Sequence, residues 1–156
     1  MITVNRRSYI EGAIPEDVFA TLSDPHGLTR LLPRIRKAEL LDMKASSARL
    51  VTHMALGGIF GTIRCEGDLL WRAPRDILFR VRTPLTLETR WTLVPAVNGT
   101  DLQASMSLDL APLLGPMAQF VPTDSVGDVL GNELASALQA ITKRCRGMSL
   151  LERVAA

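Results

Sequence analysis

Hydrophobic and polar residues alternate with a period of two through most of the segment from Ile35 to Leu110. The alternating stretches are short, and they are separated by turn-forming sequences such as LGG, RAPRD and PAVNGT. Such alternation is typical of strands that bury one face and expose the other. It predicts six consecutive antiparallel strands in this segment, preceded by a first strand that the pattern of the first ten residues indicates.

Helical signals occur after the first predicted strand and again after the last one. Pro15, followed by two acidic residues, is typical of the first turn of a helix. A second short helix is expected to begin at Pro25 and to end before Pro33. Near the C-terminus, apolar residues recur at helical spacing over about Asp124 to Arg144, which predicts a long final helix. Residues 147–156 are expected to form a tail that either frays or contacts a partner.

The two faces of the predicted sheet differ in chemistry. Because successive side chains of a strand point to opposite faces, each strand divides into an inward and an outward set. On five of the strands the inward set contains no Asp, Glu, His, Lys or Arg, whereas the outward set is rich in charged residues. The inward set therefore suits an apolar ligand held by a few hydrogen bonds, and it suits proton transfer poorly. Its polar groups belong to Thr52, Cys65, Trp71, Thr89 and Trp91.

Two glycines, Gly127 and Gly131, lie about one turn apart inside the predicted final helix. Each costs roughly 1 kcal/mol of helix stability relative to alanine, so a compensating role is expected. On a helical wheel both lie at the edge of the apolar stripe, facing or flanking the sheet. One interpretation is that they leave room for a cavity between helix and sheet, where a ligand would bind. The alternative is that they permit a close crossing of the helix over a strand.

The first strand has two registers that are compatible with its sequence, and each turns a charged residue inward. One register places Arg6 and Ser8 inside together with three apolar residues, and the other places Asn5, Arg7, Tyr9 and Glu11 inside. The four ionisable residues of this set are candidate catalytic residues, because an arginine would polarise a carbonyl and a tyrosine would act as a general acid. The alternative is an edge strand whose charges reach solvent or pair with neighbours.

Composition and charge exclude several classes of protein. The chain has 156 residues, 47% of them hydrophobic, and a formal charge of +2, which is ordinary for one globular domain. No basic run interleaved with aromatic residues occurs, so no nucleic-acid partner is expected. Cys65 and Cys145 are far apart and lack a Cys-x-x-Cys motif, so no metal site is expected. Because the sequence has no signal-like N-terminus and no apolar run long enough for a transmembrane segment, a cytoplasmic protein is expected.

Three further features have simple structural interpretations. The sequence GGIFG at residues 57–61 lacks the lysine of a phosphate-binding loop and predicts a hairpin turn, with Phe60 near a cavity entrance. His53 falls on the polar face of the sheet and is expected to be a surface residue. His26 opens the second predicted helix near the expected mouth of the cavity, where it either contacts a ligand or is a surface residue.

Several stretches of the sequence resemble one superfamily. The START-like or SRPBCC superfamily, which includes bacterial polyketide cyclases and dehydrases, coenzyme Q-binding proteins and pollen-allergen-type carriers, has an opening similar to GAIPEDVFATLSDPHGLTRLLPRI. Its sixth and seventh strands are similar to TRWTLVPAVNGTDLQASMSLDL, and its approach to the last helix is similar to LGPMAQF and VLGNELASALQAI. The resemblance implies an α+β helix-grip fold, in which a seven-stranded curved antiparallel sheet wraps around a long C-terminal helix, with two short helices between strands 1 and 2. Residues 1–146 are then one domain, and residues 147–156 are a tail.

The resemblance also implies a small-molecule ligand, because the helix-grip fold characteristically encloses a cavity. The leading hypothesis is binding or carriage of a lipid-, isoprenoid-, quinone- or polyketide-like molecule, without a cofactor. The alternative is a polyketide cyclase, aromatase or dehydratase that acts on a substrate in the same cavity. A third hypothesis is a protein-interaction module that uses an open sheet edge or the tail, and a homodimer is a further expectation. The predicted ligand-binding residues are Met54, Phe60, Cys65, Trp71, Phe79, Thr89, Trp91, Met106, Met117, Phe120, Gly127, Leu130, Gly131 and Leu134.

Overall fold

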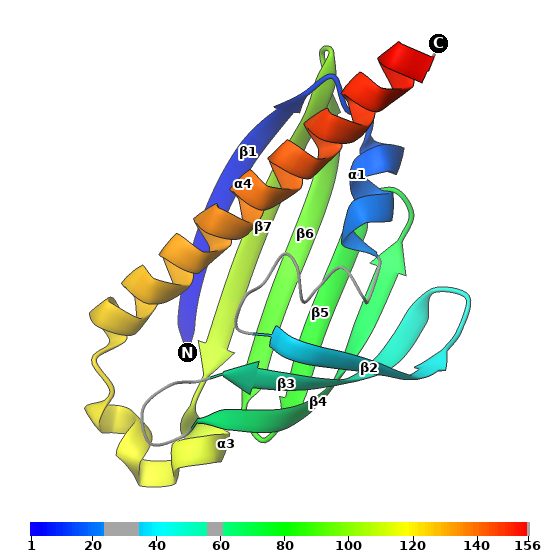
Figure 1. The fold of residues 1–156 in the computed structure, drawn as a ribbon. Helices are drawn as coiled ribbons and strands as arrows, with labels where there is room; N and C mark the ends of the chain where they lie inside the picture. The colour runs from blue at the N-terminus through cyan, green and yellow to red at the C-terminus, as the bar shows by residue number, and fades with distance from the viewer. Residues whose placement is uncertain (24–34, 56–60, 156) are drawn as a thin grey trace.

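A curved sheet, crossed on its inner face by one long helix, makes up most of the molecule (Figure 1). The computed structural model describes residues 1–23, 35–55 and 61–155, with side chains up to Cys145. The elements in chain order are β1 (Ile2–Glu11), α1 (Pro15–Leu22), β2 (Ile35–Met43), β3 (Ser47–Ala55), β4 (Thr62–Arg72), β5 (Asp76–Thr83), β6 (Thr86–Ala96), β7 (Gly99–Asp109), α3 (Ala111–Leu114), η3 (Gly115–Phe120) and α4 (Thr123–Ala155).

The strands form one antiparallel sheet with the order β1-β7-β6-β5-β4-β3-β2. From β2 to β7 each strand pairs with the next one in the sequence, and β1 completes the sheet by pairing with β7. The predicted helix-grip fold with its seven strands is therefore confirmed. Helix α1 begins at Pro15 with two acidic residues in its first turn, as predicted. The helix expected between Pro25 and Pro33 lies outside the described residues.

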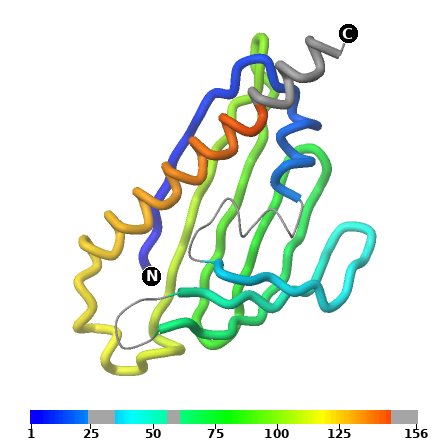
Figure 2. The backbone as a smooth tube through the Cα atoms, viewed as in Figure 1, coloured from blue at the N-terminus to red at the C-terminus, as the bar shows by residue number. Residues whose placement is uncertain are grey.

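Helix α4 lies over the inner face of the sheet and contacts β1, β7 and α1 (Figure 2). It is longer than the sequence predicted, because it begins at Thr123 and continues to Ala155 instead of ending near Arg144. The residues from 148 to 155 are mostly good helix formers and include no proline, so a single glycine at position 147 does not end the helix. The backbone of most of the expected tail is thus a continuation of α4.

The core lies between the inner face of the sheet and the apolar stripe of α4. On the central strand β5, the alternating residues Ile77, Phe79 and Val81 are each at most 2% exposed, as the period-two pattern predicted. Charged residues alternate with the apolar ones along the strands and therefore face outward. There they form ion pairs, such as that of Arg80 on β5 with Glu88 on β6. The buried stripe of α4 consists of Leu130, Leu134, Ala137, Leu138, Ile141 and Cys145.

Candidate ligand-binding cavity

The core is not filled along its whole length. Beneath the first turns of α4 lies a cavity with a volume of about 380 Å³. The inner faces of the sheet strands form its floor, α4 forms one wall, and α3 together with Val121, the residue after η3, forms another. The lining residues are Ile35, Met54, Phe79, Leu85, Leu87, Thr89, Met106, Leu108, Leu110, Leu113, Leu114, Val121, Ser125, Val126, Val129, Leu130 and Glu133.

Five of the predicted ligand-binding residues line this cavity. Met54, Phe79, Thr89 and Met106 stand at inward positions of β3, β5, β6 and β7, and Leu130 faces them from α4. They come together because the sheet pairs them directly: Thr89 lies opposite Phe79 on one side and opposite Met106 on the other. The period-two and helical patterns correctly predicted the faces on which these side chains lie. The pairing of the strands and the packing of α4 over the sheet bring the side chains together.

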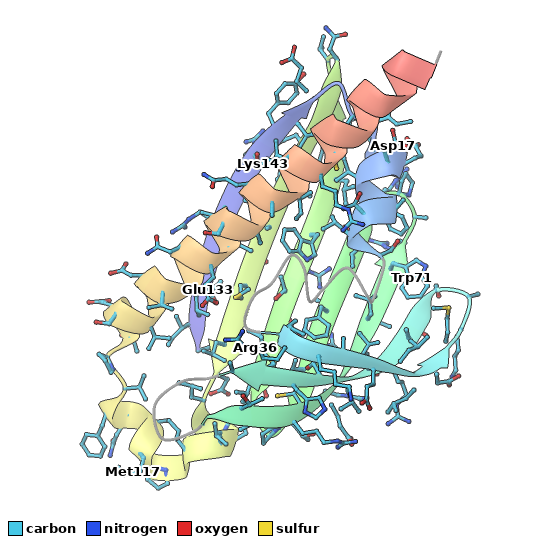
Figure 3. The ribbon with its side chains drawn as sticks, viewed as in Figure 1. Asp17, Arg36, Trp71, Met117, Glu133 and Lys143 are labelled. Carbon is cyan, nitrogen blue, oxygen red and sulfur yellow. The ribbon has the colours of Figure 1, made fainter. Side chains whose placement is uncertain are left out.

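Other predicted residues face the interior but lie away from the cavity. Cys65, Trp91 and Leu134 are each at most 4% exposed, yet none of them lines the cavity, because neighbouring core side chains enclose them. Trp71 is half-buried near the turn between β2 and β3, where its backbone N–H donates to the Ser46 carbonyl (Figure 3). Alternation alone identifies the buried face of a strand, but it does not show which part of that face borders an empty volume.

The predicted residues of the α3–η3 segment are placed differently from the expectation. Met117 and Phe120 are 62% and 72% exposed and do not line the cavity, whereas Leu113, Leu114 and Val121 of the same region do. Figure 3 shows Met117 at the outer side of this segment, pointing away from the sheet. The short 3-10 helix turns these two side chains outward, and no clear period in the sequence revealed that direction. Phe60 lies outside the described residues.

The two helix glycines face the edge strand β1 and not the cavity. A Cβ atom at Gly131 would overlap with the guanidinium group of Arg6, and one at Gly127 would lie 3.7 Å from a methyl group of Ile2. Both glycines therefore face β1, the edge strand over which α4 crosses, and neither lines the cavity. Of the two interpretations drawn from the sequence, the structure supports the close approach of helix and strand.

The register of β1 determines where the candidate catalytic residues lie. Arg6 and Ser8 point to the side of α4: the Arg6 guanidinium packs against Gly131, and the Ser8 and Thr142 hydroxyls are 3.4 Å apart. Arg7 lies on the opposite face, where its Nε donates to the Asp101 carboxylate at 2.9 Å. The first of the two registers considered for this strand is therefore the observed one.

None of the four candidate catalytic residues lines the cavity. Tyr9 is 45% exposed and its hydroxyl donates to the Val97 carbonyl, and Glu11 is exposed as well. Arg6 is on the inner side, but it is an exposed residue whose Nη1 donates to the carbonyl of Asn5 at 2.7 Å. The edge-strand interpretation of these charges is the one that the structure supports, because they reach solvent or pair with neighbours.

Sequence reasoning missed the carboxylate of Glu133, which does line the cavity from α4. A signal for it was present, because Glu133 follows Val126 by seven positions and therefore belongs to the same helical stripe. Figure 3 labels Glu133 on α4. Among the lining residues that the structure describes, it is the one side chain that ionises.

The two cysteines do not supply a nucleophile. Cys65 and Cys145 are both buried, and burial raises the pKa of each thiol above its ordinary value. A thiol with a raised pKa stays protonated near neutral pH and reacts slowly. Neither cysteine lines the cavity, so both act as small core residues.

The curved antiparallel sheet with a long C-terminal helix on its inner face is the helix-grip fold, which solved START superfamily structures share. The sequence matches, over residues 1–146, the model of the family described as polyketide cyclase / dehydrase and lipid transport, and the chain belongs to this family. No curated protein sequence matches the chain. Within the described part of the chain, no helix combines the length and the apolar character that a membrane span requires.

Solved structures with the same fold cover almost the whole chain. A protein from Thermus thermophilus is 17% identical, with a TM-score of 0.76 over 94% of this chain and 99% of its own. A START superfamily protein from Mycobacterium smegmatis is 18% identical, with a TM-score of 0.73 over 95% of this chain and 99% of its own. An aromatase/cyclase from a Streptomyces species is 15% identical, with a TM-score of 0.68 over 92% and 93%. At such identities the likeness establishes the fold alone.

Proposed function

We propose that the protein binds a hydrophobic small molecule, of lipid, isoprenoid, quinone or polyketide type, in the cavity beneath α4. The observation that carries this proposal is the lining, in which all of the described residues except Thr89, Ser125 and Glu133 are apolar. A volume of about 380 Å³ falls at the lower end of the range of about 300–1,000 Å³ that is typical of small-molecule sites. The family to which the chain belongs includes lipid transport in its description, which supports the same proposal.

Binding or carriage is favoured over catalysis because of what the lining lacks. Acid–base catalysis requires a titratable group within hydrogen-bonding distance of the reacting atoms. Among the described lining residues, only Glu133 titrates, and no histidine, lysine, arginine or tyrosine accompanies it. An apolar wall can hold and shape a ligand, but it supplies no proton donor or acceptor.

A cyclase or dehydratase is the second candidate, and Glu133 is the observation that favours it. A carboxylate beside a bound polyketide would be able to remove a proton next to a carbonyl, while the shape of the cavity holds the chain folded. Glu133 replaces the four β1 residues as the candidate catalytic residue, because those four residues do not line the cavity. With a polyketide thioester analogue as substrate, E133Q should lose turnover while it still binds the analogue; unchanged turnover would contradict a catalytic role for Glu133.

The binding proposal is tested by filling the cavity. Leu130 is 8% exposed and lines the cavity from α4, so the larger side chain of L130W should occupy the space of a ligand. Ser136 is exposed on the same helix, so S136W is a matched control that adds the same indole group outside the cavity. A panel of quinones, fatty acids and aromatic polyketides is screened by fluorescence titration and by native mass spectrometry.

Wild type and S136W should bind at least one member of the panel, and L130W should bind it at least about tenfold more weakly. Circular dichroism shows whether both variants keep the fold. If L130W is folded and binds as wild type does, or if wild type binds no member of the panel, the proposal is wrong.

A further inference from the structure

One polar atom inside the cavity has no hydrogen-bonding partner in the part of the chain that the structure describes. Thr89 lies on β6, in the middle of the sheet, and is 1% exposed. Its Oγ1 is the one buried side-chain oxygen or nitrogen, among the residues that the structure describes, without a hydrogen bond. Buried hydroxyl groups are nearly always hydrogen-bonded, because leaving one unpaired costs free energy of folding. The exception at Thr89 therefore needs a physical explanation.

The position of Thr89 supplies that explanation. Its side chain lines the cavity between those of Phe79 and Met106, which are its direct neighbours across the sheet. The other two polar lining residues differ from it, because Ser125 is exposed and Glu133 is half-buried. Thr89 thus places one hydrogen-bonding group at the buried floor of the cavity, where the other described lining residues of the strands are apolar.

We propose that the Thr89 hydroxyl anchors an uncharged oxygen of the ligand, a carbonyl or a hydroxyl group, at the buried floor of the cavity. This inference rests on the proposed function and adds the chemical class of the ligand. A threonine hydroxyl donates one hydrogen bond and accepts others, so it pairs with a ketone, a quinone or an alcohol. The apolar body of the ligand then lies against Phe79, Met106 and Leu130.

The lining argues against a carboxylate at this place. A buried carboxylate needs a cationic partner, and none of the described lining residues is a lysine, an arginine or a histidine. The ionisable side chain that does line the cavity, Glu133, has the same sign as a carboxylate ligand. A neutral ketone or alcohol should therefore bind more tightly than a carboxylic acid that has the same carbon skeleton.

The test uses three probes that share one ring system: acetylnaphthalene, ethylnaphthalene and naphthoate. They present, respectively, a neutral carbonyl group, no oxygen, and a carboxylate. T89V removes the hydroxyl while nearly keeping the shape of the side chain. T52V is the matched control, because Thr52 is also 1% exposed on the inner face of the sheet but does not line the cavity.

Wild type should bind acetylnaphthalene about tenfold more tightly than T89V does, whereas ethylnaphthalene should bind equally well to both proteins. T52V should bind both probes as wild type does. In infrared spectra, the carbonyl stretch of bound acetylnaphthalene should move to lower frequency in wild type and not in T89V. Empty T89V should unfold at a temperature no lower than wild type, which separates a binding effect from a folding effect.

Each other result overturns a specific part of the inference. If T89V binds acetylnaphthalene as tightly as wild type does, Thr89 is not the anchor, although the proposed function stands. If naphthoate binds to wild type more tightly than acetylnaphthalene does, the ligand is not of the neutral class. If none of the probes binds, this inference fails; whether the proposed function fails with it is decided by the wider ligand panel and the L130W comparison.

Discussion

Gly67 and Gly127 differ in the space that the structure leaves for a Cβ atom. Gly67 lies at the irregular pairing between β4 and β5, where a Cβ atom would overlap with the backbone carbonyl of Arg80. At Gly127 the same atom would be 3.7 Å from a methyl group of Ile2, an ordinary contact distance. The first glycine is required by a close approach of two backbones, and the second is not.

Alanine at these two positions should therefore have opposite effects on stability. G67A should lower the free energy of unfolding by about 1–3 kcal/mol, because the β5 backbone has to move. G127A should raise it by about 1 kcal/mol, because alanine is the better helix former and its methyl group would make only an ordinary contact with Ile2. Urea denaturation of both variants measures these changes. A stabilised G67A, or a G127A destabilised by as much as G67A, would contradict this account of the glycines.

Individual side chains also show why only part of the candidate site was predictable. Phe79 and Leu130 follow local periodicity, so their directions can be read from the chain. The contact between Gly131 and Arg6 joins residues far apart in the sequence, and no local pattern contains it. Likewise, whether the Thr89 hydroxyl finds a hydrogen-bonding partner depends on all the residues that surround it, and the sequence around position 89 does not contain this information.

Among the elements, β1 is the edge strand of the sheet that also supports α4. On the outer face of the sheet, the Arg7 guanidinium of β1 donates hydrogen bonds to the Asp101 carboxylate of β7, which stabilises the pairing of the two strands. These hydrogen bonds from Arg7 hold the pKa of Asp101 below its ordinary value, and a further one from Gln103 acts in the same direction. The ionised form of Asp101 is thus the form that stabilises the pairing of β1 with β7.

The contribution of this pair should depend on pH in a defined direction. Because the pKa of Asp101 is lower in the folded protein than in the unfolded chain, its stabilising effect is fully present above the ordinary carboxyl pKa of about 4. The effect is lost as the pH falls through the lower pKa of the folded state. R7Q should therefore be modestly less stable than wild type at pH 7, and the difference should vanish in acid.

Two measurements check the prediction for Arg7. Chemical denaturation of wild type and R7Q from pH 7 down to pH 2.5 or so gives the difference in unfolding free energy at each pH. NMR titration of the Asp101 carboxyl should show its pKa rising toward the ordinary value in R7Q. A stability difference that is the same at every pH would show that Arg7 acts through packing and not through the carboxylate.

The order of the elements was predictable, whereas their ends were less so. Alternation and turn residues located each strand of the meander, because a half-buried antiparallel strand imposes its period directly on the sequence. The direction of the side chains on η3 was not predictable, because this short helix has too few residues to show a period. The end of α4 was missed because one glycine between residues that are good helix formers does not stop a helix.

At the scale of the whole molecule, the interior has two parts, a closely packed core and a cavity. Around Trp91 and Leu134 the sheet, α1 and α4 pack into a solid core, whereas beneath the first turns of α4 they leave the cavity. The sequence pattern predicted one continuous apolar interior and gave no boundary between these parts. Helix α4 packs against β1, β7 and α1, whereas the cavity lies where its first turns, α3 and the inner faces of the strands meet.

We propose that residues 1–146 hold everything required for folding and ligand binding, and that the last turns of α4 serve another purpose. The model of the family matches residues 1–146, and the described residues that line the cavity extend no further along the chain than Glu133. The buried stripe of α4 has a described member as late as Cys145, so the helix is needed up to that point. A chain that ends after Arg146 keeps all of these residues.

Truncation after Arg146 should accordingly change the unfolding temperature by no more than about 4 °C, because it removes no described core residue. Ligand affinity should stay within about twofold of wild type, because the described lining residues all precede the deleted segment. Light scattering coupled to size-exclusion chromatography compares the oligomeric state of the two chains. A dimer that becomes a monomer on truncation would assign the end of α4 to subunit contact, as the interaction hypothesis expects. Loss of folding would instead show that the last turns of α4 are part of the domain.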